Sequence, residues 1–226
     1  MRGWVFKMNL DFTAVLPSFP YILKGVWVTL QIAFFAGIFG FVFGIILSLF
    51  KISHIKILNW FADLYTSIFR GTPLVLQLMI IYFGSPQVLG YQIEPINAAV
   101  LSFGLNSTAY ISEIIRGGIQ GVDKGQSEAA MALGVPYRPM MLNIVFPQAL
   151  KNILPSLMNE FITLTKESAI VTTIGVMDIM RRAYQVGSDQ FRFIEPLILA
   201  GIIYYVLVML LTLLGKAVER RMRKSD

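Results

Sequence analysis

Cysteine is absent from the 226-residue sequence, and histidine occurs once. Disulfide bonds, thiolate metal sites and cysteine nucleophiles are therefore excluded, and His54 alone makes no metal-binding cluster. Charged side chains are also scarce, at 14% of the residues, whereas 56% are hydrophobic and the mean hydropathy is +0.67. Such a chain has too little polar surface to stay soluble. The sequence therefore predicts an integral membrane protein.

Long apolar runs are the main feature that the sequence does have. A hydrocarbon core about 30 Å thick needs roughly 20 mainly apolar residues per helix, and several stretches meet this length. The predicted spans cover about residues 25–50, 57–84, 95–118, 139–168 and 191–215. The first is too long for the core of a signal peptide, so we expect it to remain as a span. With no soluble domain of appreciable size, residues 1–226 are interpreted as one all-α transmembrane domain.

Basic residues are distributed unevenly between the two sides of the predicted bundle. Cytoplasmic loops are enriched in lysine and arginine, so the side with more of them is taken as cytoplasmic. That side has Lys51, Lys56, Arg116, Lys124, Arg138, Lys216, Arg220, Arg221, Arg223 and Lys224, and the other has Arg2, Lys7, Lys24, Arg181, Arg182 and Arg192. The bias predicts an external N-terminus, a cytoplasmic C-terminus and a cytoplasmic loop at about 119–138. The net charge of +6 is then assigned to anionic lipid headgroups rather than to nucleic acid.

The second and fourth spans contain residues that are unusual in lipid. Asp63 and Arg70 interrupt the second; Pro147, Pro155, Glu160 and Lys166 interrupt the fourth. Such breaks persist only where neighbouring helices cover them, so these spans are expected to face protein or a cavity. In "FRGTP", Gly71 and Pro73 favour a kink, and Arg70 has a carbonyl or Asp63 as its expected partner.

Polar residues in the third span share one helical face. Ser102, Asn106, Ala109 and Glu113 are spaced by four, three and four residues, with Tyr110 at the edge. The face is expected to look inward, either as a lining of a substrate path or as a packing stripe with hydrogen bonds between helices. Glu113 and Arg116 are expected to form a local ion pair rather than a substrate contact.

The fourth span carries the strongest single candidate for a substrate contact. Glu160, Thr163 and Glu167 recur at helical spacing, and Lys166 lies beside them. A charged residue near the bilayer centre costs about 2.5 to 3.5 kcal/mol, so it usually pairs or lines a pathway. The carboxylate of Glu160 suits the ammonium of an amino acid or the side chain of a basic one. The alternative for Glu160 is a fixed ion pair with a lysine or arginine of a neighbouring helix. Lys166 and Glu167 are interpreted separately, as residues that suit a gate near the outer surface.

A short helix is predicted inside the cytoplasmic loop. Ser127 suits a helix start, Glu128 complements the positive helix end, and Gly134 followed by Pro136 supplies a stop. A helix of about seven residues is only about 10 Å long and is unstable alone, so a partner is expected to hold it. Small side chains suit a cleft on another protein, and those expected to be exposed are Ala129, Ala130, Ala132 and Leu133.

The loop and three further motifs carry a family resemblance. "EAAMALGVPYRPMMLNIVFPQAL" resembles the EAA loop of binding-protein-dependent ATP-binding cassette permeases. "FRGTPLVLQ", "NSTAYISEIIRGGIQ" and "MNEFITLTKESAIVTTIG" are similar to the polar amino acid branch of that family, the histidine, glutamine and arginine type. The resemblance covers roughly residues 20–220 and implies a MetI-like permease fold of about five spans. In this reading Glu128, Ala129, Ala130, Leu133, Gly134 and Arg138 form the coupling segment, with Arg138 contacting the ATPase or merely anchoring at the interface.

The resemblance also implies the partners and the mode of action. It implies a cytoplasmic ATPase, a second permease subunit, identical or different, and an external amino-acid-binding protein. The sequence has no Walker-type glycine loop, so ATP and Mg²⁺ are expected on the ATPase and no cofactor in this chain. We expect a transport subunit that imports a polar amino acid by alternating access and is not itself an enzyme. The rivals are a stand-alone channel or secondary carrier, which needs no docking helix, and an intramembrane hydrolase, which needs a nucleophile with its base.

Overall fold

The computed structural model describes residues 10–223, and these residues form helices and no strands. The all-α prediction is confirmed. Arg2, Lys7 and Lys224, which contribute to the predicted orientation, lie outside the described residues. The α-helices are α1 (Phe19–Leu23), α2 (Gly25–Ile52), α3 (Lys56–Gly71), α4 (Leu74–Leu89), α5 (Pro95–Gln120), α6 (Lys124–Ala132), α7 (Tyr137–Met140), α8 (Phe146–Glu167), α9 (Ile179–Asp189) and α10 (Ile194–Arg223).

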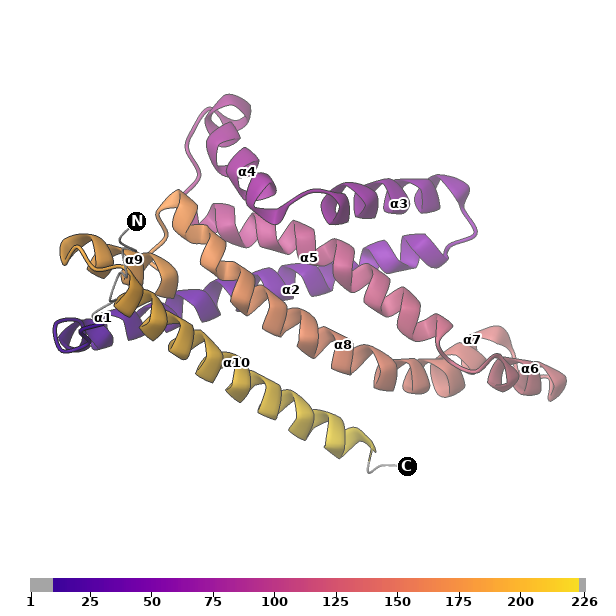
Figure 1. Cartoon of the computed structure of the whole chain (residues 1–226). Helices are drawn as coiled ribbons and strands as arrows, with labels where there is room; N and C mark the ends of the chain where they lie inside the picture. Colours follow the sequence, from indigo (N-terminus) through magenta and orange to yellow (C-terminus); the bar gives the residue numbers. More distant parts are fainter. Residues whose placement is uncertain (1–9, 224–226) are drawn as a thin grey trace, which may run out of the picture.

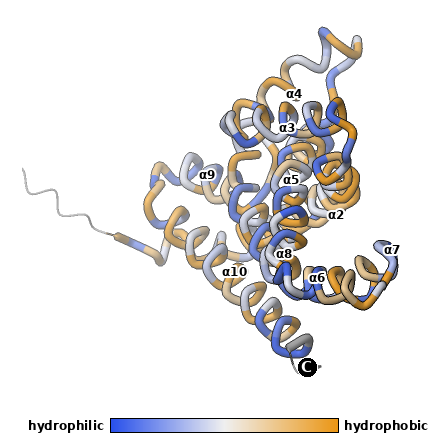
Figure 2. The backbone as a smooth tube through the Cα atoms, turned by 90° about the vertical axis from the view of Figure 1, so that its right-hand side faces the viewer, coloured by the Kyte–Doolittle hydropathy of each residue, from blue (hydrophilic) through white to orange (hydrophobic). Residues whose placement is uncertain are grey.

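Four long helices, α2, α5, α8 and α10, run alongside one another (Figure 1). Helix α2 packs along α5, α5 packs against α8, and α8 packs against α10. The short helices α1 and α9 lie at one end of this bundle, and α6 and α7 lie at the other. Figure 2 shows α2 largely in the hydrophobic colour, whereas the C-terminal end of α10 is hydrophilic. The end that carries α6 is therefore also the end with the basic C-terminal segment.

Glycines allow α2 and α5 to approach closely. A Cβ placed on Gly40 would lie 2.7 Å from the Cβ of Ser107, and one on Gly44 would lie 2.8 Å from the Cγ2 of Ile111. Helices in membranes associate through such small residues, since lipid supplies no hydrophobic drive between them. The glycine face of α2 is thus committed to contacts within the chain.

Within residues 10–223, three helical segments are long and apolar enough to cross a membrane, namely Leu16–Ile52, Pro95–Gln120 and Ile194–Arg221. They correspond to the first, third and fifth predicted spans. The pair α3 and α4 adds a fourth only if it counts as one bent span. The predicted fourth span contains α8, which has 22 residues and lies between α5 and α10 but is too polar to meet the same criterion.

The second predicted span is broken rather than kinked. The axes of α3 and α4 meet at 100° across the break at Gly71, Thr72 and Pro73. The break frees carbonyl groups, and the carbonyl of Phe69 accepts hydrogen bonds from the amides of Gln77 and Asn106 at 2.9 Å each. The Oε1 of Gln77 in turn accepts from Asn106. Neighbouring side chains therefore satisfy the broken backbone, as a non-helical segment at membrane depth requires.

Candidate functional site

Glu160 lies half-buried on α8, facing α5. Its Oε1 accepts a hydrogen bond of 2.9 Å from the hydroxyl of Ser107. Among the side chains that the structure describes, no lysine or arginine forms an ion pair with Glu160. The alternative interpretation, a fixed ion pair between Glu160 and a neighbouring helix, therefore has no cationic partner among the described residues. A carboxylate in a spanning bundle is left with one neutral partner.

A cavity of about 340 Å³ adjoins this carboxylate. Its walls come from α2, α5 and α8, and Glu160 is the only ionisable side chain among them. Apolar and small residues supply the rest: Phe34, Gly37, Ile38, Phe41, Ser107, Ile111, Leu157, Met158, Phe161 and Leu164. Binding sites for small molecules are commonly of this kind, with apolar walls and few polar groups that fix the orientation. The arrangement suits a ligand with an apolar stem and a cationic or hydrogen-bonding head.

Ser107 was not among the candidates from the sequence. It follows Asn106 directly, so it lies on a different face of α5 from the predicted stripe. The signal that identifies it is the tight packing of Gly40 against it, which sequence spacing within α5 alone does not reveal.

The other candidates on α8 do not line the cavity. Thr163 and Glu167 are half-buried and Lys166 is exposed. Their positions after Glu160 carry them toward the end of the bundle that holds α9, opposite to α6. These three side chains therefore lie beyond the walls of the cavity, on the side toward α9.

The predicted stripe on α5 is buried, and its structural partners are now defined. Ser102 and Ala109 are inaccessible, and Asn106 holds the bend between α3 and α4 through Phe69 and Gln77. Tyr110 is partly exposed, and the guanidinium of Arg70 lies 5.3 Å from the centre of its ring. In this conformation Asn106 therefore packs the helices together, while Tyr110 is the member of the group that reaches the surface.

An ion-pair network joins α2, α3 and α5 on the side toward α6. The ammonium of Lys51, whose side chain is 4% exposed, has three acceptors: Asp63 at 2.9 Å, Glu113 at 2.6 Å and the hydroxyl of Thr66 at 3.0 Å. Glu113 also pairs with Arg116, as the sequence predicts. Asp63 pairs with Lys51 and not with Arg70.

Arg70 completes this group from its outer edge. Its guanidinium lies 3.9 Å from Glu113, so the predicted return to Asp63 or to a carbonyl is replaced by contacts with Glu113 and Tyr110. The reason is the break at Gly71, which ends α3 beside α5. The network thus fixes the break relative to α2 and α5.

The loop helix α6 begins earlier than the sequence indicates. The cap is Asp123, whose Oδ1 accepts from the amide of Gly125 at 2.8 Å, and Ser127 lies inside the helix. The stop is as predicted, because Gly134 has a φ of +73°, which favours glycine. The expectation that Ala130 is exposed is wrong. Ala130 is 3% exposed and packs in a cluster with Met140, Val145 and Ala149, which holds the short helix against α7 and α8.

The exposed surface of α6 and the following turn is apolar at its centre. Leu133 is 83% exposed, and Met131 and Tyr137 are exposed beside it. Glu128, Ala129, Ala132, Gly134 and Arg138 are exposed as well. The sequence analysis did not single out Met131. Together these residues give a compact apolar surface with a carboxylate and a guanidinium at its margins.

Comparisons with known proteins agree with this arrangement. Residues 40–224 match the family described as "Binding-protein-dependent transport system inner membrane component". The arginine transport system permease protein ArtQ of Bacillus subtilis is 60% identical over 219 residues, covering 97% of this chain and all of ArtQ. A putative glutamine transport system permease protein of Rickettsia felis is 48% identical over 206 residues, covering 91% and 94%.

Solved structures show the same fold. The crystal structure of an amino acid ABC transporter with histidines matches with a TM-score of 0.90 at 42% identity, covering 95% of this chain and all of that one. The MetNI methionine ABC transporter in an inward-facing conformation matches with a TM-score of 0.74 at 22% identity, covering 91% and 98%. The second match supports the MetI-like fold alone.

Proposed function

The chain belongs to the family of binding-protein-dependent transport system inner membrane components, and from this premise we propose that Glu160 binds the cationic group of the transported amino acid. The chain is the transmembrane subunit of an ATP-driven importer for a polar amino acid. A separate ATPase subunit hydrolyses ATP, and a binding protein delivers the substrate. The chain is thus a multi-pass protein of the inner membrane and a transport subunit.

The single observation that carries the proposal is the carboxylate of Glu160 in a cavity whose other walls are uncharged. A buried carboxylate is costly unless a cation pairs with it. The α-ammonium and α-carboxylate of a zwitterionic amino acid cancel, so such a substrate leaves the charge of Glu160 in place. An amino acid with a cationic side chain neutralises the site, and ArtQ, at 60% identity, is named for arginine. We therefore propose a substrate of the arginine type, with Thr163, Lys166, Glu167 and Tyr110 along its path.

Coupling is proposed to run through the exposed surface of α6. Glu128, Ala129, Leu133, Gly134 and Arg138 contact a cleft on the ATPase, while Ala130 anchors the helix to its own chain. ATP and Mg²⁺ bind the ATPase, and this chain holds no cofactor. Movement of α6 with its cleft passes to α5 and α8 through the cluster around Ala130. That coupling alternates the access to Glu160 between the two sides.

The assembly and the orientation are also part of the proposal. Two permease subunits assemble, because the cavity at Glu160 lies along the side of a single chain and a second subunit completes a closed path. The N-terminus is external and the C-terminus is cytoplasmic, because α6 and the basic end of α10 lie at the same end of the bundle. A docking surface for an ATPase on α6 requires that end to be cytoplasmic.

Substitution of Glu160 by glutamine tests the proposed substrate contact. Glutamine keeps the size and the hydrogen bond to Ser107 but removes the charge. Loss of a charged hydrogen bond of about 1.5 to 3 kcal/mol predicts a fall of about ten- to hundredfold in arginine uptake by reconstituted complexes. The binding-protein-independent ATPase activity and the thermal stability remain near those of the parent.

Glu94→Gln is the matched control, since Glu94 is exposed and precedes α5. It is expected to transport normally. Unchanged uptake by Glu160→Gln would place the substrate contact elsewhere, and a loss of assembly would show instead that Glu160 has a structural role.

A further inference from the structure

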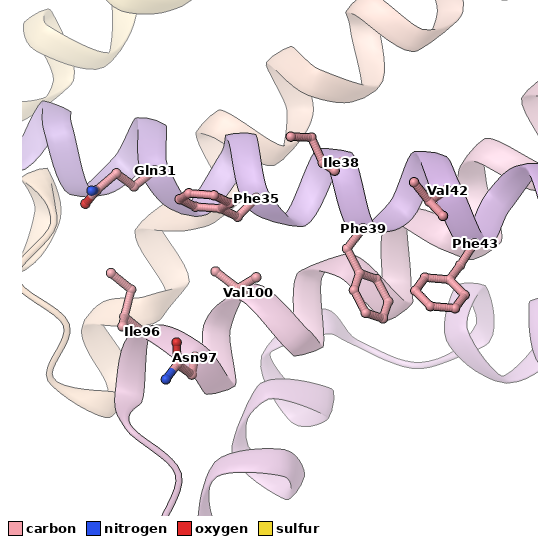
Figure 3. Close-up of a pocket in the computed structure, with 9 residues that line it drawn as sticks. All are labelled: Gln31, Phe35, Ile38, Phe39, Val42, Phe43, Ile96, Asn97 and Val100. Carbon is pink, nitrogen blue, oxygen red and sulfur yellow. The ribbon is translucent and has the colours of Figure 1, made fainter.

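A second cavity of about 590 Å³ lies along the junction of α2 and α5. Its lining is Gln31, Phe35, Ile38, Phe39, Val42 and Phe43 from α2, with Ile96, Asn97 and Val100 from α5 (Figure 3). Only Ile38 also borders the cavity of Glu160, so α2 separates the two. This groove, which we call the α2–α5 groove, is not part of the proposed substrate path.

The walls of the α2–α5 groove do not suit a packed helix. Close packing of membrane helices uses glycine and other small residues. The small residues of α2 are already occupied, because Gly40 and Gly44 pack against Ser107 and Ile111. The groove presents phenylalanine and branched side chains instead, with space between them (Figure 3). A flexible acyl chain can fill such an irregular apolar space.

Two amide side chains lie at one end of the groove. Gln31 comes from α2 and Asn97 from the start of α5 (Figure 3). Within residues 10–221, neither side chain forms a hydrogen bond with another group. An amide without a partner in or near hydrocarbon is costly. This end therefore calls for a ligand that brings hydrogen-bond acceptors.

The length of the groove matches one leaflet of a bilayer. From Gln31 to Phe43 a helix rises by about 18 Å, and half of a hydrocarbon core is about 15 Å thick. The amide of Asn97 lies at the start of α5, at the end of the bundle that holds α9 and opposite to α6, and we take this end as the polar boundary of that leaflet. An occupant with acceptors at the boundary and a chain of one leaflet's length is a phospholipid.

We propose that the α2–α5 groove binds one phospholipid, with an acyl chain between Phe35 and Phe43. The amides of Gln31 and Asn97 donate hydrogen bonds to its ester or phosphate oxygens. The lipid belongs to the leaflet opposite to α6. It seals the junction of α2 and α5 on the side away from Glu160, so the site is separate from the substrate contact.

The test uses the permease–ATPase complex in nanodiscs that contain phosphatidylglycerol with a photoactivatable group in the middle of one acyl chain. Crosslinked peptides are quantified at the groove and at Tyr205 and Leu210, which are exposed on α10. The parent is expected to label strongly in the groove. In the double variant Gln31→Leu, Asn97→Leu, labelling of the groove is expected to be about tenfold weaker than in the parent, since two ordinary hydrogen bonds account for about that factor.

Labelling at Tyr205 and Leu210 serves as the internal reference and stays unchanged. Gln87→Leu, at an exposed position on α4, is the matched control and keeps the groove label. Equal labelling of the groove and α10 that is insensitive to the double variant would overturn the proposal. Crosslinks between two permease chains at Phe35 or Val42 would also overturn it, because a second copy would then cover the groove.

Discussion

Asp178 shows how one buried residue at the end of the bundle affects stability. It is 0% exposed and precedes α9, where its Oδ1 accepts from the amide of Arg181 at 2.8 Å and its Oδ2 accepts from the hydroxyl of Tyr204 at 3.0 Å. Burial raises the pKa of Asp178 to about 6, although these hydrogen bonds oppose the shift. The folded state therefore holds this proton more tightly than the unfolded state, in which the pKa is that of an ordinary aspartate.

A pH dependence of stability follows from this carboxyl. The contribution of the Asp178 carboxyl to the free energy of unfolding is complete below about pH 4 and is lost as the pH rises through about 6. The loss is at most about 3 kcal/mol, because one pKa unit corresponds to about 1.4 kcal/mol. Asp178→Asn retains both hydrogen bonds, since its carbonyl accepts from Arg181 and its amide donates to Tyr204. We expect the variant to exceed the parent in thermal stability at pH 7.5 and to match it at about pH 3.5.

The measurement is the unfolding temperature of both proteins in detergent across this range. The difference between the two proteins isolates Asp178 from other titrating groups. If both lose stability in parallel as the pH rises, the pKa of Asp178 is not raised in the folded state.

Among the helices, the bend between α3 and α4 marks where the sequence was informative and where it was not. Gly71 and Pro73 predicted the position of the break, because each disfavours a continuous helix there. The angle of 100° was not predictable, since it depends on Gln77 and Asn106, which meet Phe69 only in the folded chain. The same limit applies to Ala130, whose burial depends on the later residues Met140 and Val145.

The exposed surface of α6 leads to a prediction about coupling. Leu133→Glu places a charge where an apolar side chain is 83% exposed, so the permease itself should fold normally. Central apolar residues of an interface contribute about 2 kcal/mol or more, so at least a tenfold fall in ATPase retained during purification is expected. Transport falls with it.

Ala130→Leu provides the contrasting variant. It adds volume to a packed cluster within the chain and should lower the unfolding temperature of the permease. Normal ATPase retention by Leu133→Glu would show that docking uses another surface. Equal effects of both substitutions on stability would show that Leu133 is part of the permease core.

At the scale of the whole molecule, the apolar runs and the EAA motif were sufficient for the fold class and the family. Three spans follow from apolarity alone, whereas α8 has the length of a span but too many polar residues. That polarity includes Glu160, which lies on the wall of a cavity that α2 and α5 also line. The partner of Glu160 was not predictable, since Ser107 lies outside the polar stripe of α5 and reaches Glu160 only through the packing of three helices.

Direct binding of an amino acid to the permease tests the central role of Glu160 most closely. Radiolabelled arginine is equilibrated with the purified permease–ATPase complex in the absence of the binding protein, and glutamine serves as competitor. We predict that the parent binds arginine, that glutamine competes weakly, and that Glu160→Gln loses arginine binding while remaining assembled. Equal binding of arginine by the parent and by Glu160→Gln would contradict the account, because the substrate contact would then lie elsewhere in the permease.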